Sequence, residues 1–68
     1  MKISARNQIK GTIKAVRPGA TTTHVDIDVG PTVITASITN ESAQDMKLAP
    51  GQTAYAVIKA SDVMVGVD

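Results

Sequence analysis

The chain has 68 residues, which suits one small domain, so we expect a single domain over residues 1–68. It contains no cysteine, which excludes disulfides and thiolate metal sites, and its formal charge of +1 argues against a polyanion-binding surface. Hydrophobic residues make up 43% of the chain but only one residue is aromatic, and so small an interior cannot easily hide that much apolar surface. We therefore expect a homo-oligomer in which other subunits cover part of it.

The first predicted element is a long β-strand from Lys2 to Val16. Its residues alternate between two sides with a period of two, and the polar side is a row of cations and hydrogen-bond donors. The other side carries Ile3, Ala5, Ile9, Ile13 and Ala15, with Asn7 and Gly11 among them. We expect a bend at Gly11, and Arg17-Pro18-Gly19 predicts a turn.

Two more strands and a short helix follow. Residues 20–29 alternate again until Gly30-Pro31, and residues 32–38 form a run rich in β-branched side chains. Thr39 to Ser42 are residue types that cap helix N-termini, and residues 43–48 suit a helix of about two turns. The pattern predicts a helix directly after the third strand.

The chain ends with two further predicted strands, residues 53–59 and 63–67, joined by a tight connection at 60–62. The predicted fold is therefore all-β, an OB-like five-stranded barrel with one short helix between strands 3 and 4. Barrel closure would remove the exposed strand edges. The start, Met1-Lys2-Ile3-Ser4, predicts neither a signal peptide nor a membrane span, so we expect a cytoplasmic protein without a membrane partner.

Two segments far apart in the sequence, Ser4–Gln8 and Lys59–Ser61, each combine a cation with a small hydroxyl residue and lack a carboxylate. A tetrahedral oxyanion needs hydrogen-bond donors and positive charge with no competing negative oxygen. A helix start between Thr39 and Ser42 would add unpaired N–H groups. We predict that these three segments meet around an oxyanion, at a site shared between subunits because one short chain can hardly enclose an ion.

A family resemblance rests on three motifs: Ser4-Ala5-Arg6-Asn7-Gln8 followed by Lys10-Gly11, Thr39-x-x-Ser42 after Ile34-Thr35, and Lys59-Ala60-Ser61-Asp62-Val63. Over essentially its whole length the chain resembles the Mop family, or molbindins, which are small molybdate- and tungstate-binding proteins. The resemblance implies a homohexamer, a trimer of dimers, that holds molybdate, or alternatively tungstate, at subunit interfaces for intracellular molybdenum storage and homeostasis. The ligands it implies are Ser4, Arg6, Thr39, Ser42, Lys59, Ala60 and Ser61, of which Ala60 can offer only its backbone N–H.

The remaining polar residues indicate no catalytic or metal-binding site. His24 has no second histidine or cysteine with which to bind a metal, so we interpret it as a structural or surface residue. Asp26 and Asp28 lie on one predicted strand face, and the loop spacing of a calcium site is absent. No nucleophile–base pair or paired acids are visible, so we expect no enzyme and no metal held directly by side chains.

Two alternatives from other functional classes remain. An OB-like barrel can bind single-stranded nucleic acid, but that mode needs aromatic stacking platforms along a basic groove, and this chain has one tyrosine and almost no net charge. We therefore expect no nucleic-acid partner, which an oligonucleotide binding assay would check. The other alternative is a purely structural oligomerisation module. Equilibrium dialysis against molybdate and sulfate would separate it from an oxyanion-binding protein.

Overall fold

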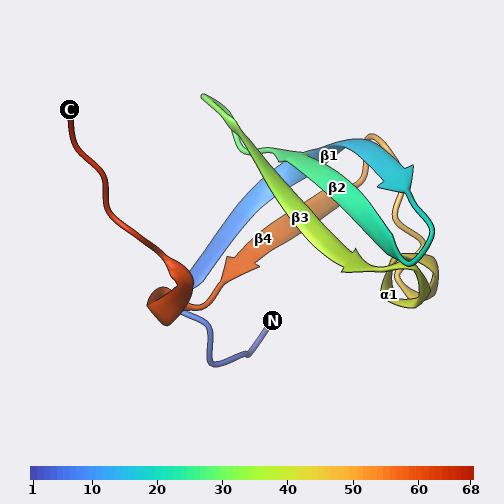
Figure 1. Ribbon diagram of the computed structural model, residues 1–68, viewed down its shortest axis with the longest axis horizontal. Coiled ribbons are helices and arrows are strands. Elements are labelled where there is room, and N and C mark those ends of the chain that lie inside the picture. The colour runs from blue at the N-terminus through green and yellow to red at the C-terminus, as the bar shows by residue number, and fades with distance from the viewer.

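The computed structural model describes all 68 residues and consists of four β-strands, one short α-helix and one 3-10 turn (Figure 1). The strands are β1 (Asn7–Pro18), β2 (Thr22–Asp28), β3 (Val33–Thr39) and β4 (Thr53–Ile58). The helix α1 (Asn40–Asp45) follows β3, and the 3-10 turn η1 (Ala60–Asp62) follows β4. No helix in the chain is long and apolar enough to cross a membrane.

The four strands form one antiparallel sheet in the order β3-β2-β1-β4. The sheet curls into an open half-barrel, with α1 at one end and η1 at the other (Figure 1). The strand edges of β3 and β4 are not paired with any other strand. The all-β, OB-like class is thus as predicted, but the barrel is not closed.

The expected fifth strand is absent from this sheet. Residues 63–67 are extended but pair with no strand, and the chain beyond η1 runs away from the sheet (Figure 1). The alternating sequence sets the local backbone preference, but a strand also needs a partner edge, and this segment meets none within its own chain. The first strand is also shorter than predicted. It begins at Asn7, opposite Ile58, because β4 offers no residue to pair with Lys2–Arg6.

A β-bulge divides β1, and the sequence pattern does not predict it. The register shifts between Ile13, which pairs with Ile27, and Ala15, which pairs with Asp26. The extra residue moves Val16, rather than Ala15, opposite the buried Val25. The bulge shifts the alternation of side chains by one residue and thus keeps a large side chain on the inner face.

The core is small and aliphatic. Its buried cluster consists of Ile13, Val25, Ile27 and Ala56, contributed by three adjacent strands. Gly11 allows β1 to approach the end of β2, because a Cβ there would lie 2.4 Å from the carbonyl oxygen of Asp28. Only six of the 68 residues are buried in the single chain, which is few for a folded domain.

The helix is shorter than expected and begins earlier. Thr39 is the N-cap, as the residue types predict, but α1 ends at Asp45 rather than near Leu48. Lys47 adopts a left-handed conformation with φ of 52°, and its N–H donates to the Gln44 carbonyl oxygen. The N–H of Leu48 donates to the carbonyl oxygen of Ala43, which completes a Schellman motif that stops the helix.

Candidate anion-binding site

Strand pairing brings Arg6 and Lys59 to the same end of the sheet. Asn7 and Ile58 form the last pair of the β1–β4 ladder, and the side-chain amide of Asn7 donates to the Ile58 carbonyl oxygen at 3.2 Å. Arg6 directly precedes this pair and Lys59 directly follows it. Both cations are exposed and neither forms an ion pair or a side-chain hydrogen bond within the chain. Their donors are therefore free to meet an external anion.

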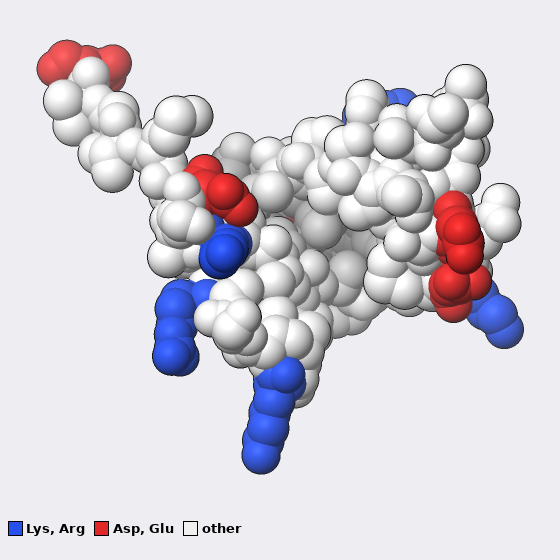
Figure 2. Space-filling view, turned by 60° about the horizontal axis from the view of Figure 1, so that its bottom comes forward, with Lys and Arg blue, Asp and Glu red and all other residues white.

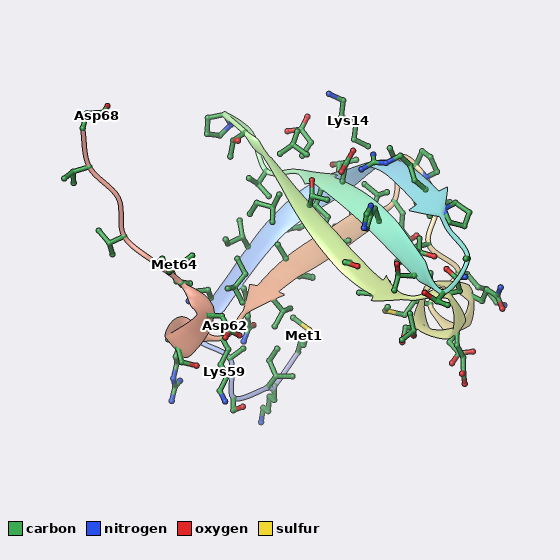
Figure 3. The ribbon with its side chains drawn as sticks, viewed as in Figure 1. Met1, Lys14, Lys59, Asp62, Met64 and Asp68 are labelled. Atoms are coloured by element: carbon green, nitrogen blue, oxygen red, sulfur yellow. The ribbon has the colours of Figure 1, made fainter.

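The hydroxyl residues of the same end are equally unpartnered. Ser61 lies in η1, which is closed by the N–H of Asp62 donating to the Lys59 carbonyl oxygen at 2.9 Å. Ser4 lies in the extended N-terminal segment, and both serines are exposed. Asp62 lies beside Lys59 without reaching ion-pair distance of it (Figure 3). We call Ser4, Arg6, Lys59, Ala60 and Ser61 the cationic end.

The helix start lies elsewhere. Thr39 pairs with Thr22 at the far end of the sheet, next to the end of β1, whereas Arg6 precedes the start of β1. At roughly 3.3 Å per residue, the 12 residues of β1 separate α1 from the cationic end along the sheet, and Figure 1 shows α1 and η1 at opposite ends. The three predicted segments therefore do not meet within one chain. Thr39 and Ser42 thus lie apart from the cationic end of their own chain.

Hydrogen bonds within the helix cap occupy part of the donor capacity of α1. The hydroxyl oxygen of Thr39 accepts from the Ser42 N–H at 3.0 Å, and the Thr39 hydroxyl donates to the Ser42 hydroxyl oxygen at 2.8 Å. The proton of the Ser42 hydroxyl is left without an acceptor. Thr39 acts as a capping residue first, and Ser42 is the better placed donor for an anion.

Sequence reasoning missed a polar anchor beneath the helix. The side-chain amide of Asn40 donates to the Gly19 carbonyl oxygen at 3.0 Å, and its oxygen accepts from the hydroxyl of the buried Thr23 at 2.6 Å. The backbone N–H of Asn40 donates to the Thr21 carbonyl oxygen. This residue thus fixes the helix start to the β1–β2 turn. An asparagine directly after a predicted N-cap was the available signal.

A second missed feature lies on the outer face of the sheet. Arg17 on β1 forms a bidentate ion pair with Asp26 on β2, and the hydroxyl of Thr35 on β3 donates to the same carboxylate at 2.9 Å. The hydrogen bonds from Arg17 and Thr35 lower the pKa of the Asp26 carboxyl, and the same pair raises the pKa of Arg17. Asp26 on β2 is therefore bonded to side chains of both neighbouring strands. No group of three or more acidic, histidine or cysteine residues in the chain is placed to hold a metal ion.

Two hollows mark the surface. A hollow of about 260 Å³ with a mixed polar and apolar lining lies between α1 and the adjoining strand ends, and Asn40 and Lys47 are among the residues that line it. A larger one of about 430 Å³ is lined almost entirely by apolar side chains and is called the apolar groove below. Neither hollow includes Arg6 or Lys59, so the cationic end is an open surface in the single chain.

Comparisons with known proteins agree with this fold and these motifs. Residues 3–65 match the TOBE domain family. The chain is 42% identical to a probable molybdenum-pterin-binding protein of Haemophilus influenzae, over 100% of both chains. A solved molybdate-binding protein from Sporomusa ovata superposes with a TM-score of 0.93 at 34% identity, covering 98% of this chain and 100% of the other.

The cytoplasmic molybdate-binding protein ModG, solved with molybdate bound, also superposes with a TM-score of 0.93. It is 40% identical over 100% of this chain, which spans 49% of the ModG chain. Family match, full-length identity and structural likeness all cover the motifs at both chain ends. The chain belongs to the TOBE domain family and is a member of the Mop proteins, the molbindins.

Proposed function

We propose that this protein binds molybdate reversibly, as a dianion, through its cationic end, and carries out no chemistry on it. The observation that carries the proposal is the unpartnered state of Arg6 and Lys59, which flank the last pair of the β1–β4 ladder at the same end of the sheet. The names of its relatives support the same ligand, since they are described as molybdenum-pterin-binding or molybdate-binding proteins.

The chemistry of the donors favours this class of anion. Molybdate at neutral pH carries no proton, so all its oxygens accept hydrogen bonds, and a site made only of N–H, O–H and cationic groups fits it. Phosphate near pH 7 still carries a proton on part of its population, and that proton needs an acceptor. Each unsatisfied buried polar group costs about 1–3 kcal/mol, which disfavours phosphate. Sulfate must be rejected by cavity size, and tungstate, a similar tetrahedral dianion, would be accepted.

The placement of the ligands supports a site between subunits. One chain presents the cationic end and the Thr39–Ser42 helix start on opposite ends of its sheet. An anion held by members of both sets needs at least two copies of the chain, and a hexamer built as a trimer of dimers would supply them. Charge-assisted hydrogen bonds of about 1.5–3 kcal/mol each, several per anion, would give micromolar or tighter binding. Such a protein suits storage and buffering of molybdenum in the cytoplasm.

Equilibrium dialysis against molybdate, with sulfate and phosphate as competitors, tests the proposal. The Arg6→Ala and Lys59→Ala variants should each lose roughly ten- to hundredfold in molybdate affinity, because each removes a charge-assisted hydrogen bond. Lys14→Ala is the matched control, since Lys14 projects from the outer side of the sheet, away from Lys59 (Figure 3). Unchanged affinity and stoichiometry in both site variants would refute the assignment.

A further inference from the structure

Both cations of the candidate site lie just outside the β1–β4 ladder, where strand pairing no longer holds the backbone. Arg6 directly precedes the last pair, and the residues before it have no partner strand, while Lys59 directly follows that pair. Figure 2 shows cationic side chains projecting into solvent from the end of the molecule that carries the C-terminal segment. Backbone beyond the end of a ladder frays readily. Long side chains on a frayed backbone lose conformational entropy when they bind a ligand, and that loss weakens the affinity.

The side chain of Asn7 fastens the ladder at this end. Asn7 is half-buried and lies on the same side of β1 as the buried Ile13, where an apolar residue would fit the alternation. Its amide donates to the carbonyl oxygen of Ile58 at 3.2 Å, and that carbonyl shares a planar peptide group with the nitrogen of Lys59. On the other side, the Lys59 carbonyl oxygen accepts from the N–H of Asp62 at 2.9 Å. The backbone of Lys59 is therefore held on both sides.

The backbone of Arg6 is held in a similar way by Gln8. The side-chain amide of Gln8 donates to the carbonyl oxygen of Ala5 at 3.0 Å, and that carbonyl shares a peptide group with the nitrogen of Arg6. On its other side Arg6 joins Asn7, which is already part of the ladder. The Gln8 hydrogen bond is exposed, so water competes with it, and it should contribute less than the half-buried bond of Asn7. Both cations thus combine an anchored backbone with a side chain that has no partner in the chain.

We propose that Asn7 and Gln8 are positioning residues of the anion site, Asn7 acting through Lys59 and Gln8 acting through Arg6. This inference rests on the proposed function and adds two residues that need not touch the anion. Each amide is bonded to a backbone carbonyl oxygen next to a cation, so its effect on the anion passes through the backbone of that cation. The entropy of ordering these backbones is lost during folding, before any anion arrives, and the binding step does not include it.

The Asn7→Val variant separates positioning from stability. Valine suits a strand and an apolar position, so the fold should keep its stability, but the donor to the Ile58 carbonyl oxygen is lost. Molybdate affinity in equilibrium dialysis should fall roughly three- to tenfold, the equivalent of one hydrogen bond. Ile27→Val is the matched control, because it removes a methylene group from the core, which should lower stability in urea unfolding and leave the affinity unchanged. Wild-type affinity in Asn7→Val, or an equal loss in Ile27→Val, would overturn the role of Asn7.

Double-mutant cycles identify the cation through which each amide acts. In a Lys59→Ala chain, Asn7→Val should cause less than about a twofold further loss of molybdate affinity, because the cation that Asn7 positions is gone. Gln8→Ala should lower the affinity about two- to threefold in the wild-type chain and have no further effect in an Arg6→Ala chain. The cross pair, Gln8→Ala with Lys59→Ala, is the control, and its two losses should multiply. Losses that also multiply for Asn7 with Lys59 would show that Asn7 does not act through that cation.

NMR relaxation of the full-length protein without molybdate tests the anchoring independently of any ligand. The backbone order parameter of Lys59 should fall in Asn7→Val and stay at the wild-type value in Ile27→Val. An unchanged order parameter in Asn7→Val would overturn the positioning role even if the wild-type protein binds molybdate. If the order parameter falls but the wild-type protein takes up no molybdate in dialysis, the proposed function is wrong while the anchoring of Lys59 by Asn7 stands. The two failures are therefore distinguishable.

Discussion

The two ends of the sheet use the same kinds of residue in opposite ways. At the α1 end the polar side chains bond to each other and to the backbone, as Thr39 does with Ser42 and Asn40 does with Thr23 and Gly19. At the cationic end Arg6, Lys59 and their neighbouring serines have no partner in the chain. A polar group that is already bonded stabilises the fold, whereas an unbonded one can bind a ligand. Binding capacity is therefore concentrated at the end whose cations and serines form no side-chain bonds within the chain.

The largest effect is expected from a substitution in β1, the strand that connects the two ends of the sheet. Gly11→Ala places a methyl group 2.4 Å from the Asp28 carbonyl oxygen, where backbone must move, and should cost about 1–3 kcal/mol of unfolding free energy. Because Gly11 lies in β1, the shift should also disturb Arg6 and lower molybdate affinity. Thermal or urea unfolding with dialysis measures both.

Gly66→Ala is the control for that change, since it adds the same methyl group where no atom lies within 4 Å. Equal stability of the two variants would mean that the contact between β1 and β2 relaxes at little cost.

The next largest effect is expected from a substitution that affects the α1 end alone. Asn40→Ala removes the acceptor of the buried Thr23 hydroxyl and should cost about 1–3 kcal/mol of unfolding free energy. Gln44→Ala, in the same helix but with no side-chain hydrogen bond, should be close to neutral. Urea unfolding of both variants measures the difference, and an equal effect would contradict the role assigned to Asn40.

A stabilising change is expected at the end of the same helix. Lys47 is the only non-glycine residue with positive φ, at 52°, and it occupies the position where Schellman motifs favour glycine. Lys47→Gly should therefore raise the unfolding free energy by up to about 1 kcal/mol. Lys47→Ala is the comparison that removes the same charge without relieving the backbone, and it should not stabilise. A rise in melting temperature with Lys47→Ala would place the gain in the charge instead.

The smallest effect concerns the outer face. The hydrogen bonds of Asp26 lower its pKa in the folded state below the ordinary value of 3.8, so the carboxylate contributes stability above that value. That contribution falls as pH drops from the ordinary value through the folded pKa. Asp26→Asn should remove this part of the acid dependence and change little at neutral pH, because the Arg17 side chain is half exposed and solvent screens the pair. Melting curves from pH 2 to 7 measure it.

The sequence predicts most of the strands because period-two alternation depends on which face is buried, and it predicts the Thr39 cap because capping is local. It does not predict the bulge near Ala15, since the shift in register appears only in the pairing of β1 with β2 and not in the residue types of β1. It also assigns a fifth strand to residues 63–67, whose pattern is typical of a strand but which pair with no strand of the chain. Local rules succeed where the required partners are near in sequence.

For the site, the residue types alone indicate an anion but do not show which chains surround it. The placement of Arg6 and Lys59 at one end of the sheet arises from a ladder that joins residues 51 positions apart, Asn7 and Ile58. No pattern within either segment encodes that register. The separation of Thr39 from both cations follows from the same topology, and a shared site was predicted only from the small size of the chain and from the family resemblance.

Tyr55, the single aromatic residue, lines the apolar groove and is 47% exposed. The chain contains no tryptophan, so all its intrinsic near-ultraviolet emission originates from this one phenol. Any occupant of the groove would change the polarity and quenching around that chromophore. The protein therefore carries a built-in optical reporter in the apolar groove, and no dye is needed to detect a molecule that enters it.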